Sequence, residues 1–302
     1  MKKIKFSFFG GAEPTFDFHL FKQVIEYIKQ KSKADGFEYI FGMTTNGCYG
    51  SEVMDYIIQN FNSITYSLDG PEFVQNFHRP MLNGKGSFDI VFRNAKKLYN
   101  SNLKFGFRLT VSAITLKRWK EVIDFFEKEF KNSELYLAPL LPIGRGADDD
   151  LQPILPNEWQ NLAKEIYLYA KDKVKVHFPN VESPEIVSAS FCGAATANLW
   201  IISKDGTIST CPHDRLNPIH MIGSYDFDEN TFEIDEKKVE QIRERFSVLN
   251  YPECKDCFCK YTCAGGCPSQ KVFGLKPVCE MTRTLTKLKF SEYLKENGLT
   301  RY

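Results

Sequence analysis

The sequence predicts an α/β fold over residues 1–175, followed by a loop-rich, cysteine-rich domain over residues 176–302. Short runs of β-branched and aromatic residues alternate with amphipathic stretches from Lys2 to about Lys173, which is typical of parallel strands joined by crossover helices. This pattern then fades, and eight of the nine cysteines lie at or beyond Cys192. The change in composition predicts two domains of different kinds.

The predicted strands and helices of the first domain follow one another in alternation. The strand-like runs are Ile4 to Phe9, Tyr39 to Thr45, Ile64 to Leu68, Lys104 to Val111 and Glu134 to Leu141. The stretches with apolar residues at helical spacing are Phe18 to Lys31, Ser51 to Asn60, Phe88 to Tyr99, Leu116 to Phe130 and Pro156 to Lys173. We therefore expect five strands, each followed by a helix that covers the outer face of the sheet.

Glycine-bearing loops follow four of these strands. They are Gly10-Gly11-Ala12-Glu13-Pro14, Thr44-Thr45-Asn46-Gly47, Asp69-Gly70-Pro71 and Gly144-Arg145-Gly146. Because ligands bind at the carboxyl ends of parallel strands, these loops predict the active face. Each loop taken alone is also explained as a plain turn, since glycines end strands in many strand–helix units.

The charge balance and the hydropathy pattern exclude several classes of partner. Lys plus Arg number 39 against 38 Asp plus Glu, so a formal charge of +1 provides no bulk field for nucleic acid or an anionic membrane. Stretches such as Phe105 to Val111 and Leu135 to Ile143 are roughly half the length that a membrane helix needs. The basic start has no signal-peptide core or cleavage site. We expect a cytoplasmic protein with no nucleic-acid or membrane partner.

The second domain begins with a predicted hairpin. Leu199 to Ser203 and Thr207 to Thr210 are strand-like and flank an Asp205-Gly206 turn, where glycine supplies the positive φ that a tight turn needs. Cys211 ends the hairpin. An acidic turn and a charged helix are expected between Tyr225 and Asn250.

The last stretch, from Cys254 to Cys279, has little apolar periodicity, so metal ligation would have to stabilise it where a core cannot. Two residues separate Cys254 from Cys257, five more precede Cys263, and three precede Cys267. A two-residue spacing lets one turn direct both thiolates at the same metal.

Seven cysteines belong to this array, too many for one tetrahedral ion: Cys192, Cys211, Cys254, Cys257, Cys263, Cys267 and Cys279. In an intracellular protein such clusters are metal ligands more often than disulfides. Iron–sulfur clusters are predicted, and a pair of structural zinc sites is the alternative. Cys48 and Cys259 fall outside the spacing pattern and are interpreted as thiols.

The cysteine pattern, including Gly206 before Cys211, resembles the SPASM domain that carries auxiliary 4Fe-4S clusters in radical S-adenosylmethionine (SAM) enzymes. The resemblance implies two clusters. It assigns one to Cys254, Cys257, Cys263 and Cys279, and the other to Cys192, Cys211 and Cys267. The fourth ligand of the latter would be Cys259, another residue type, or an open site for substrate.

The first half resembles the partial barrel of the same enzymes, in which a Gly-Gly-Glu-Pro motif holds the amino group of SAM. The counterpart here is Gly11-Ala12-Glu13-Pro14, preceded by Gly10, with Ala12 in place of the second glycine. The segments Ser67 to Pro71, His78-Arg79-Pro80 and the surroundings of Arg108 also resemble the family. The resemblance implies that Ser67, Asp69 and Arg108 bind SAM, with the arginine fork on its carboxylate. A surface salt bridge is the alternative for Arg108.

The defining motif of the family, three cysteines at spacings of three and then two residues, is absent. In relatives it binds the cluster that chelates SAM and delivers the electron for its cleavage. We therefore expect a (β/α)6 TIM-like partial barrel whose first strand–helix unit is missing, and a chain that does not cleave SAM as written. A misassigned start, a truncated gene and a split protein are the possible explanations.

The function implied by the resemblance is a maturase that crosslinks or oxidises a side chain of a peptide or protein. It would use a 5'-deoxyadenosyl radical, auxiliary clusters that pass an electron out, and an electron donor such as a flavodoxin or ferredoxin. An anaerobic sulfatase maturase is a further alternative. In those enzymes an aspartate base follows the cysteine matching Cys211, whereas Pro212 stands here. His213 and Asp214 are the candidate bases, with a polar loop role as the other reading.

The competing hypothesis is a non-catalytic iron–sulfur module that binds a peptide or relays electrons for a partner. A zinc-binding structural protein ranks last, because it leaves the Glu13-Pro14 loop and the barrel pattern unexplained.

Overall fold

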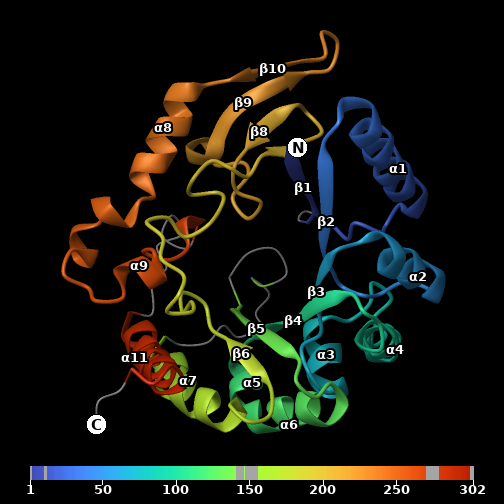
Figure 1. Ribbon diagram of the computed structural model, residues 1–302. Helices are drawn as coiled ribbons and strands as arrows, with labels where there is room; N and C mark the ends of the chain where they lie inside the picture. Colours follow the sequence, from blue (N-terminus) through green and yellow to red (C-terminus); the bar gives the residue numbers. More distant parts are fainter. Residues whose placement is uncertain (1, 10–11, 141–145, 147–155, 270–278, 300–302) are drawn as a thin grey trace. The chain divides into compact units, whose positions relative to one another are not determined.

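The computed structural model describes residues 2–9, 12–140, 146, 156–269 and 279–299. It divides into two compact units, Met1–His177 and Phe178–Tyr302, which are treated separately below (Figure 1).

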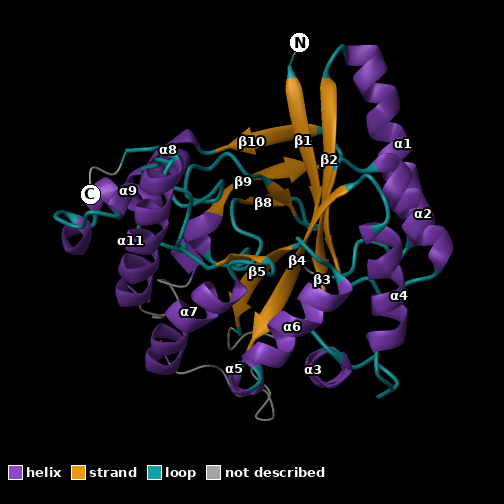
Figure 2. Ribbon diagram, turned by 60° about the horizontal axis from the view of Figure 1, so that its bottom comes forward, coloured by secondary structure: helices purple, strands orange, loops and turns teal. Residues whose placement is uncertain are grey.

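The first unit is built on a six-stranded, fully parallel sheet whose strands follow chain order from β1 to β6. Its strands are β1 (Lys3–Phe8), β2 (Glu38–Thr45), β3 (Ser63–Ser67), β4 (Lys104–Val111), β5 (Glu134–Pro139) and β6 (Lys175–His177). Its helices are α1 (Phe18–Asp35), α2 (Ser51–Asn60), α3 (Glu72–His78), α4 (Phe88–Tyr99), α5 (Ala113–Lys117), α6 (Trp119–Glu129) and α7 (Pro156–Ala170). Figures 1 and 2 show the sheet curved, with the helices on its convex face.

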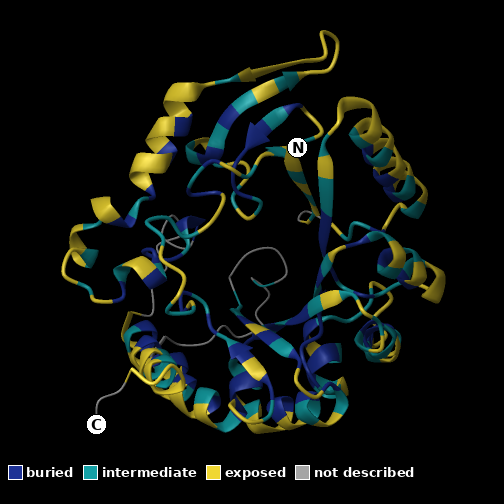
Figure 3. Ribbon diagram, in the orientation of Figure 1, coloured by how far each residue is buried: buried dark blue, intermediate teal, exposed yellow. Residues whose placement is uncertain are grey.

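The period of two along each strand decides which side chains meet the helices. On β4, Phe107 packs against Phe126 and Phe130 with ring centroids 5.1 and 4.7 Å apart, and Leu109 is fully buried. The intervening side chains, including Arg108, therefore face the concave side of the sheet. Figure 3 shows the same division, with buried residues between the sheet and its helices. This burial leaves the concave side to polar residues.

The predicted α/β class is confirmed, but the sequence reasoning missed three details. It expected five strands, whereas β6 (Lys175–His177) makes a sixth. Three residues are too few to show alternation. It also missed α3, and it merged α5 and α6, which the structure breaks at Arg118, whose φ is −126° and ψ 23°.

The second unit contains a four-stranded antiparallel sheet in the order β10-β9-β8-β7. Its strands are β7 (Ile201–Ile202), β8 (Thr207–Ser209), β9 (Met221–Asp226) and β10 (Thr231–Ile234). The predicted hairpin is confirmed as β7 and β8, with Gly206 at φ +81°. Strands β9 and β10 were not predicted. Helix α8 (Glu236–Arg245) is the expected charged helix, and it closes a small core made by Ala195, Ala197, Ile208, Ile222, Val239, Ile242 and Phe246.

Beyond α8 the described residues form short elements and then one long helix. They are the 3-10 turns η3 (Val248–Asn250) and η4 (Pro252–Cys254), the helical turn α9 (Lys260–Cys263) and the helix α11 (Cys279–Glu296). An earlier 3-10 turn, η2 (Pro218–His220), precedes β9. Within the described ranges, no helix combines the length and apolar character needed to cross a membrane.

Candidate functional site

Glu13 fastens the loop after β1 to the end of β2. Its carboxylate accepts hydrogen bonds from Thr45 Oγ1 at 2.8 Å and from the backbone N–H of Asn46 at 2.7 Å. Thr15 Oγ1 donates to the same carboxylate at 2.9 Å. The carboxylate therefore holds two neighbouring strand ends together, so the predicted loop is positioned by its own glutamate.

The other residues of the predicted Gly-Gly-Glu-Pro counterpart are less informative. Ala12 is exposed and Pro14 is half-buried. Gly10 and Gly11 fall outside the described residues, as do Gly144 and Arg145 of another predicted loop.

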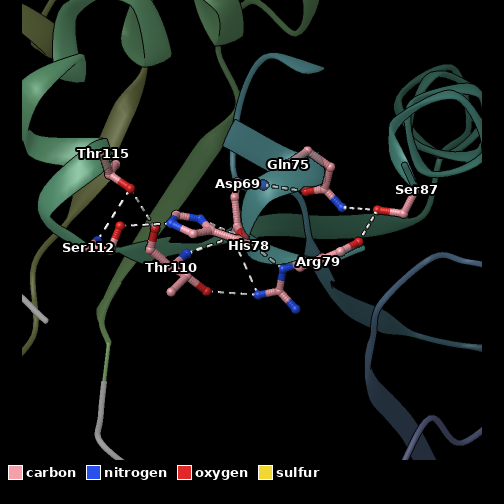
Figure 4. A network of polar contacts seen from close by, with 8 residues as sticks. All are labelled: Asp69, Gln75, His78, Arg79, Ser87, Thr110, Ser112 and Thr115. Carbon is pink, nitrogen blue, oxygen red and sulfur yellow. Dashed lines mark hydrogen bonds and ion pairs between the residues drawn. The ribbon is translucent and has the colours of Figure 1, made fainter. Parts of the chain in front are cut away.

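Asp69, directly beyond β3, is the hub of a buried polar network (Figure 4). Its Oδ2 accepts from Arg79 Nε at 2.8 Å and lies 3.2 Å from His78 Nδ1. Its Oδ1 accepts from the backbone N–H of Thr110 at 2.7 Å, and its own N–H donates to Gln75 Oε1 at 3.0 Å. The network joins the ends of β3 and β4 to helix α3.

Arg79 and His78 keep Asp69 in its charged form. Burial would raise the pKa of this carboxyl, but Arg79 and His78 outweigh burial and hold the pKa well below its usual 3.8. Asp69 is also completely buried. In this structure both carboxylate oxygens are occupied by these partners, and the contact of Asp69 with SAM stays a prediction. Its role is to hold Arg79 in place.

Asp69, His78 and Ser112 lie in the order of a hydrolase triad, with His78 Nε2 2.8 Å from Ser112 Oγ. Ser112 is only 1% exposed, and it caps α5 in a reciprocal capping box with Thr115. A nucleophile must meet its substrate, so this arrangement is a structural relay rather than a hydrolytic site.

Ser67 and Arg108 are direct neighbours in the parallel register of β3 and β4. Burial and the nearby Arg79 lower the pKa of Arg108, whereas Asp69 raises it. Arg79 is hydrogen-bonded to this carboxylate, whereas Arg108 has no ion pair with any other described residue, so its charge is available to a ligand. That charge, with the hydroxyl of Ser67 beside it, fits a ligand carboxylate such as that of SAM.

Tyr136 and His177 continue this row across β5 and β6, with Arg108 opposite Tyr136 and Tyr136 opposite His177. Their rings stack with centroids 4.3 Å apart and planes within 10°. A side chain on Gly106 would come within 2.5 Å of the Tyr136 ring, which explains the glycine there. The sequence reasoning missed both residues, because it missed β6.

The nine cysteines all lie in the described part of the chain, and none is in a disulfide. Burial raises the pKa of the Cys263 thiol to about 11, and the nearby thiols of Cys279, Cys254 and Cys257 raise it too. These four thiols come from the loop around α9 and from the first residue of α11. Crowded thiolates repel one another, and a bound metal relieves that repulsion while it displaces their protons.

Arg283, one turn after Cys279 on α11, hydrogen-bonds to Cys257. Burial raises the pKa of Cys257, but backbone donation and Arg283 lower it overall. The pKa of Cys259 shifts in the opposite direction. This residue is buried, its Sγ lies 3.4 Å from that of Cys257, and burial with that neighbour raises its pKa to about 12. No sequence motif marks Arg283, because a helical arginine carries no pattern of its own.

A second group of thiols forms around Cys211. Burial raises the pKa of Cys192, and Cys211 adds to the shift, so these two thiols are neighbours. Cys211 Sγ also lies 2.8 Å from the hydroxyl of Ser269, which follows Cys267 by two residues. The three cysteines that the resemblance assigned together thus lie in segments that meet.

The donor chemistry of both groups is that of thiolate-bound metal, although no three His, Cys, Asp or Glu side chains among the described residues already surround one point as a metal ion requires. The sulfur donors fit iron–sulfur clusters, which thiolates hold.

The candidate bases after Cys211 have local partners. Asp214 accepts from Asn217 Nδ2 at 3.1 Å, and its carboxylate lies 3.7 Å from His220 Nε2. Burial lowers the pKa of His220, and Asp214 counteracts that effect. His213 is exposed. In the first unit, Cys48 is half-buried, and burial and Glu13 raise its pKa.

Comparison with known proteins identifies relatives over most of the chain. No protein-family model matches it. A cysteine-type anaerobic sulfatase-maturating enzyme of Clostridium novyi (strain NT) is 22% identical over 278 residues, which cover 87% of this chain and 73% of that enzyme.

Two solved structures have a similar fold. Native anSMEcpe with bound AdoMet and Kp18Cys peptide has a TM-score of 0.65 at 18% identity, covering 98% of this chain and 83% of that one. Streptococcus suis SuiB bound to precursor peptide SuiA has a TM-score of 0.51 at 13% identity, covering 89% and 62%. The chain is therefore similar over most of its length to anaerobic sulfatase-maturating enzymes and shares the α/β fold of anSMEcpe and SuiB.

Proposed function

We propose that this chain forms the main body of a radical SAM maturase that acts on a peptide or protein side chain. The first unit binds SAM on the concave face of its sheet, and the second unit holds two auxiliary 4Fe-4S clusters. The observation that supports this proposal is the spacing of Cys254, Cys257, Cys263 and Cys279, whose thiols lie near enough for the other three to raise the pKa of Cys263, in a region built of short turns.

At the SAM end, Arg108 binds the ligand carboxylate and Ser67 supplies a hydroxyl beside it. Asp69 and Arg79 keep the site in shape without touching the ligand, because the Asp69 carboxylate is enclosed. Glu13 sets the position of the loop after β1. Bound SAM supplies the hydrogen-abstracting chemistry, and a flavodoxin or ferredoxin is the external electron donor.

At the cluster end, Cys254, Cys257, Cys263 and Cys279 hold one cluster, with Arg283 stabilising the negative charge of Cys257. Cys192, Cys211 and Cys267 hold the other. The clusters carry electrons away from the substrate.

The substrate is a peptide segment, in keeping with the peptides bound to anSMEcpe and to SuiB. A crosslinking or oxidising peptide maturase is favoured over a sulfatase maturase, because Pro212 offers no ionisable group where the latter have an aspartate base.

The deciding experiment is an assay of iron, acid-labile sulfide and zinc on protein that is purified and reconstituted without oxygen. About eight irons with matching sulfide per chain are expected for two four-iron clusters. Stoichiometric zinc without sulfide would overturn the proposal. The sequence contains no three-cysteine motif of the radical cluster, so cluster loading and SAM binding are the appropriate readouts.

A further inference from the structure

We propose that the Ser269 hydroxyl donates a hydrogen bond to the Cys211 thiolate and thereby raises the reduction potential of the cluster that Cys211 holds. This inference rests on the proposed function, because it requires a cluster at Cys192, Cys211 and Cys267. Hydrogen bonds to the sulfur ligands are among the factors that set the potential of an iron–sulfur cluster. Neither the spacing of the cysteines nor the family resemblance assigned a role to Ser269.

The contact joins two buried groups that are distant in the sequence. Ser269 Oγ lies 2.8 Å from Cys211 Sγ, across 58 positions of the chain. Ser269 is 1% exposed and Cys211 is 4% exposed. A buried hydroxyl needs a hydrogen-bond partner, and the sulfur atom is the partner that this contact provides.

The surroundings place this contact at the predicted cluster. Cys192 and Cys211 are two of the cysteines that the family resemblance assigns to one cluster. Cys267 precedes Ser269 by two residues. The segment from Cys267 to Ser269 therefore supplies both a candidate ligand and a hydroxyl group near Cys211.

The distance between Ser269 Oγ and Cys211 Sγ decides whether Ser269 is a ligand of iron or a hydrogen-bond donor to the thiolate. Each protein ligand of a four-iron cluster binds a different iron, so two ligand atoms stand farther apart than a hydrogen bond. A separation of 2.8 Å is a direct contact between the hydroxyl and the sulfur rather than the spacing of two ligands on separate corners. Ser269 thus acts on the thiolate and not on iron. Donation to the thiolate withdraws negative charge from the cluster, which favours the reduced form.

The test is a potentiometric titration of the reconstituted protein, followed by electron paramagnetic resonance, with Ser269→Ala and Ser269→Thr. Ser269→Ala should keep the iron and sulfide content of the unaltered protein. One of its two reduction steps should move to lower potential while the other stays in place. Ser269→Thr retains the hydroxyl and should restore the original potential. The unmoved step serves as an internal standard.

Thr286→Val is the matched control for loss of a buried hydroxyl. Thr286 is 1% exposed, and its Oγ1 has no hydrogen-bond partner within the described residues. Its substitution should leave both steps in place, and an equal shift there would overturn the inference. Loss of about four irons in Ser269→Ala would show a ligand instead of a donor.

Failure of the inference and failure of the proposed function are distinguishable. An iron-loaded Ser269→Ala with unchanged potentials overturns the inference alone. Absence of iron and sulfide from the unaltered protein overturns both.

Discussion

Asp69 shows how one residue can serve a ligand site without entering it. The family resemblance placed it with Ser67 and Arg108, yet its carboxylate is enclosed and its oxygens accept from Arg79 and from the backbone of Thr110. A buried charge is tolerated only with partners, and the partners here are the cations that border the proposed carboxylate site. The residue is therefore needed for the placement of the arginines.

Substitution of this carboxylate should lower stability strongly. Asp69→Asn leaves Arg79 and Arg108 without a counter-charge, and removing one partner of a buried pair costs about 3–5 kcal/mol. We expect a cost at the lower end of this range of free energies, because the Arg79 side chain is 25% exposed and water screens its charge. Urea unfolding at pH 7 measures the change. Glu26→Gln, which removes an exposed i,i+3 pair with Lys29, is the control and should cost less than about 1 kcal/mol. Equal effects of the two substitutions would contradict the buried-hub interpretation.

The loss of stability in Asp69→Asn should depend on pH in a predictable way. The pKa of Asp69 is lowered in the folded state, so its contribution is complete above its unfolded-state value of about 3.9 and is lost as the pH falls toward the folded value. The stability difference between the unaltered protein and Asp69→Asn should be constant from pH 7 to pH 5 and should shrink below about pH 4. Urea midpoints across this range give the answer, and a difference that widens in acid would refute the assigned charge state.

Arg108 should determine whether the ligand carboxylate is recognised. Arg108→Ala removes the fork and should weaken SAM binding about tenfold or more, as loss of a charge-assisted contact implies. Equilibrium dialysis with SAM and with its decarboxylated analogue separates the carboxylate contact from the rest, since the variant should no longer distinguish the two. Lys5→Ala is the control, because Lys5 is an exposed cation on β1 of the same unit. An unchanged preference in Arg108→Ala would remove Arg108 from the site.

At the scale of the elements, the sequence was most informative where periodicity was long. The bounds of α2, α4 and β4 were predicted to the residue, because each shows two or more full periods of its pattern. Strands β6 and β7 have three and two residues, and periodicity cannot define such short elements, so β7 was predicted only because the Asp205-Gly206 turn marks its hairpin with β8. Their pairing depends on tertiary contacts with β5 and β8 instead.

The residues of the candidate site also differ in how far the sequence reveals them. Spacing indicated Cys254, Cys257, Cys263 and Cys267 as candidate ligands, since metal ligation imposes a local pattern. Ser269 and Arg283 carry no such pattern, because they reach Cys211 and Cys257 through the fold.

The β7–β8 turn gives an element-scale prediction. Gly206 has φ +81°, and a side chain there would overlap the carbonyl oxygen of Tyr225 on β9. Gly206→Ala should cost more than about 2 kcal/mol, because left-handed strain of about 1–2 kcal/mol adds to a clash with backbone. Gly298→Ala has φ +65° and open space, so it should show the strain alone. Hydrogen exchange at β8 and β9 measures the local destabilisation caused by Gly206→Ala. Urea unfolding compares the free-energy costs of the two substitutions. Similar costs would argue against the clash.

At the scale of the whole molecule, the two units have different sources of stability. The first has a continuous parallel sheet covered by helices, with large buried side chains such as Phe41, Phe107 and Trp159. Among the described residues of the second, a small core lies beneath α8, and the stretch from η3 to α9 is made of short turns. A chain segment without a core depends on cross-links or metal for its order.

Removal of metal should therefore affect the two units unequally. Metal-free protein should lose amide protection across residues 248–269 and at the start of α11, while β3 and β4 of the first unit keep theirs. Hydrogen exchange on reconstituted and metal-free samples measures this difference, and Cys263→Ala should reproduce the metal-free pattern in the second unit. Cys48→Ser is the matched control, since that thiol belongs to the first unit and lies outside the array. Equal loss of protection in both units would mean that metal supports the whole chain, and no loss in either would mean that the thiols are not ligands.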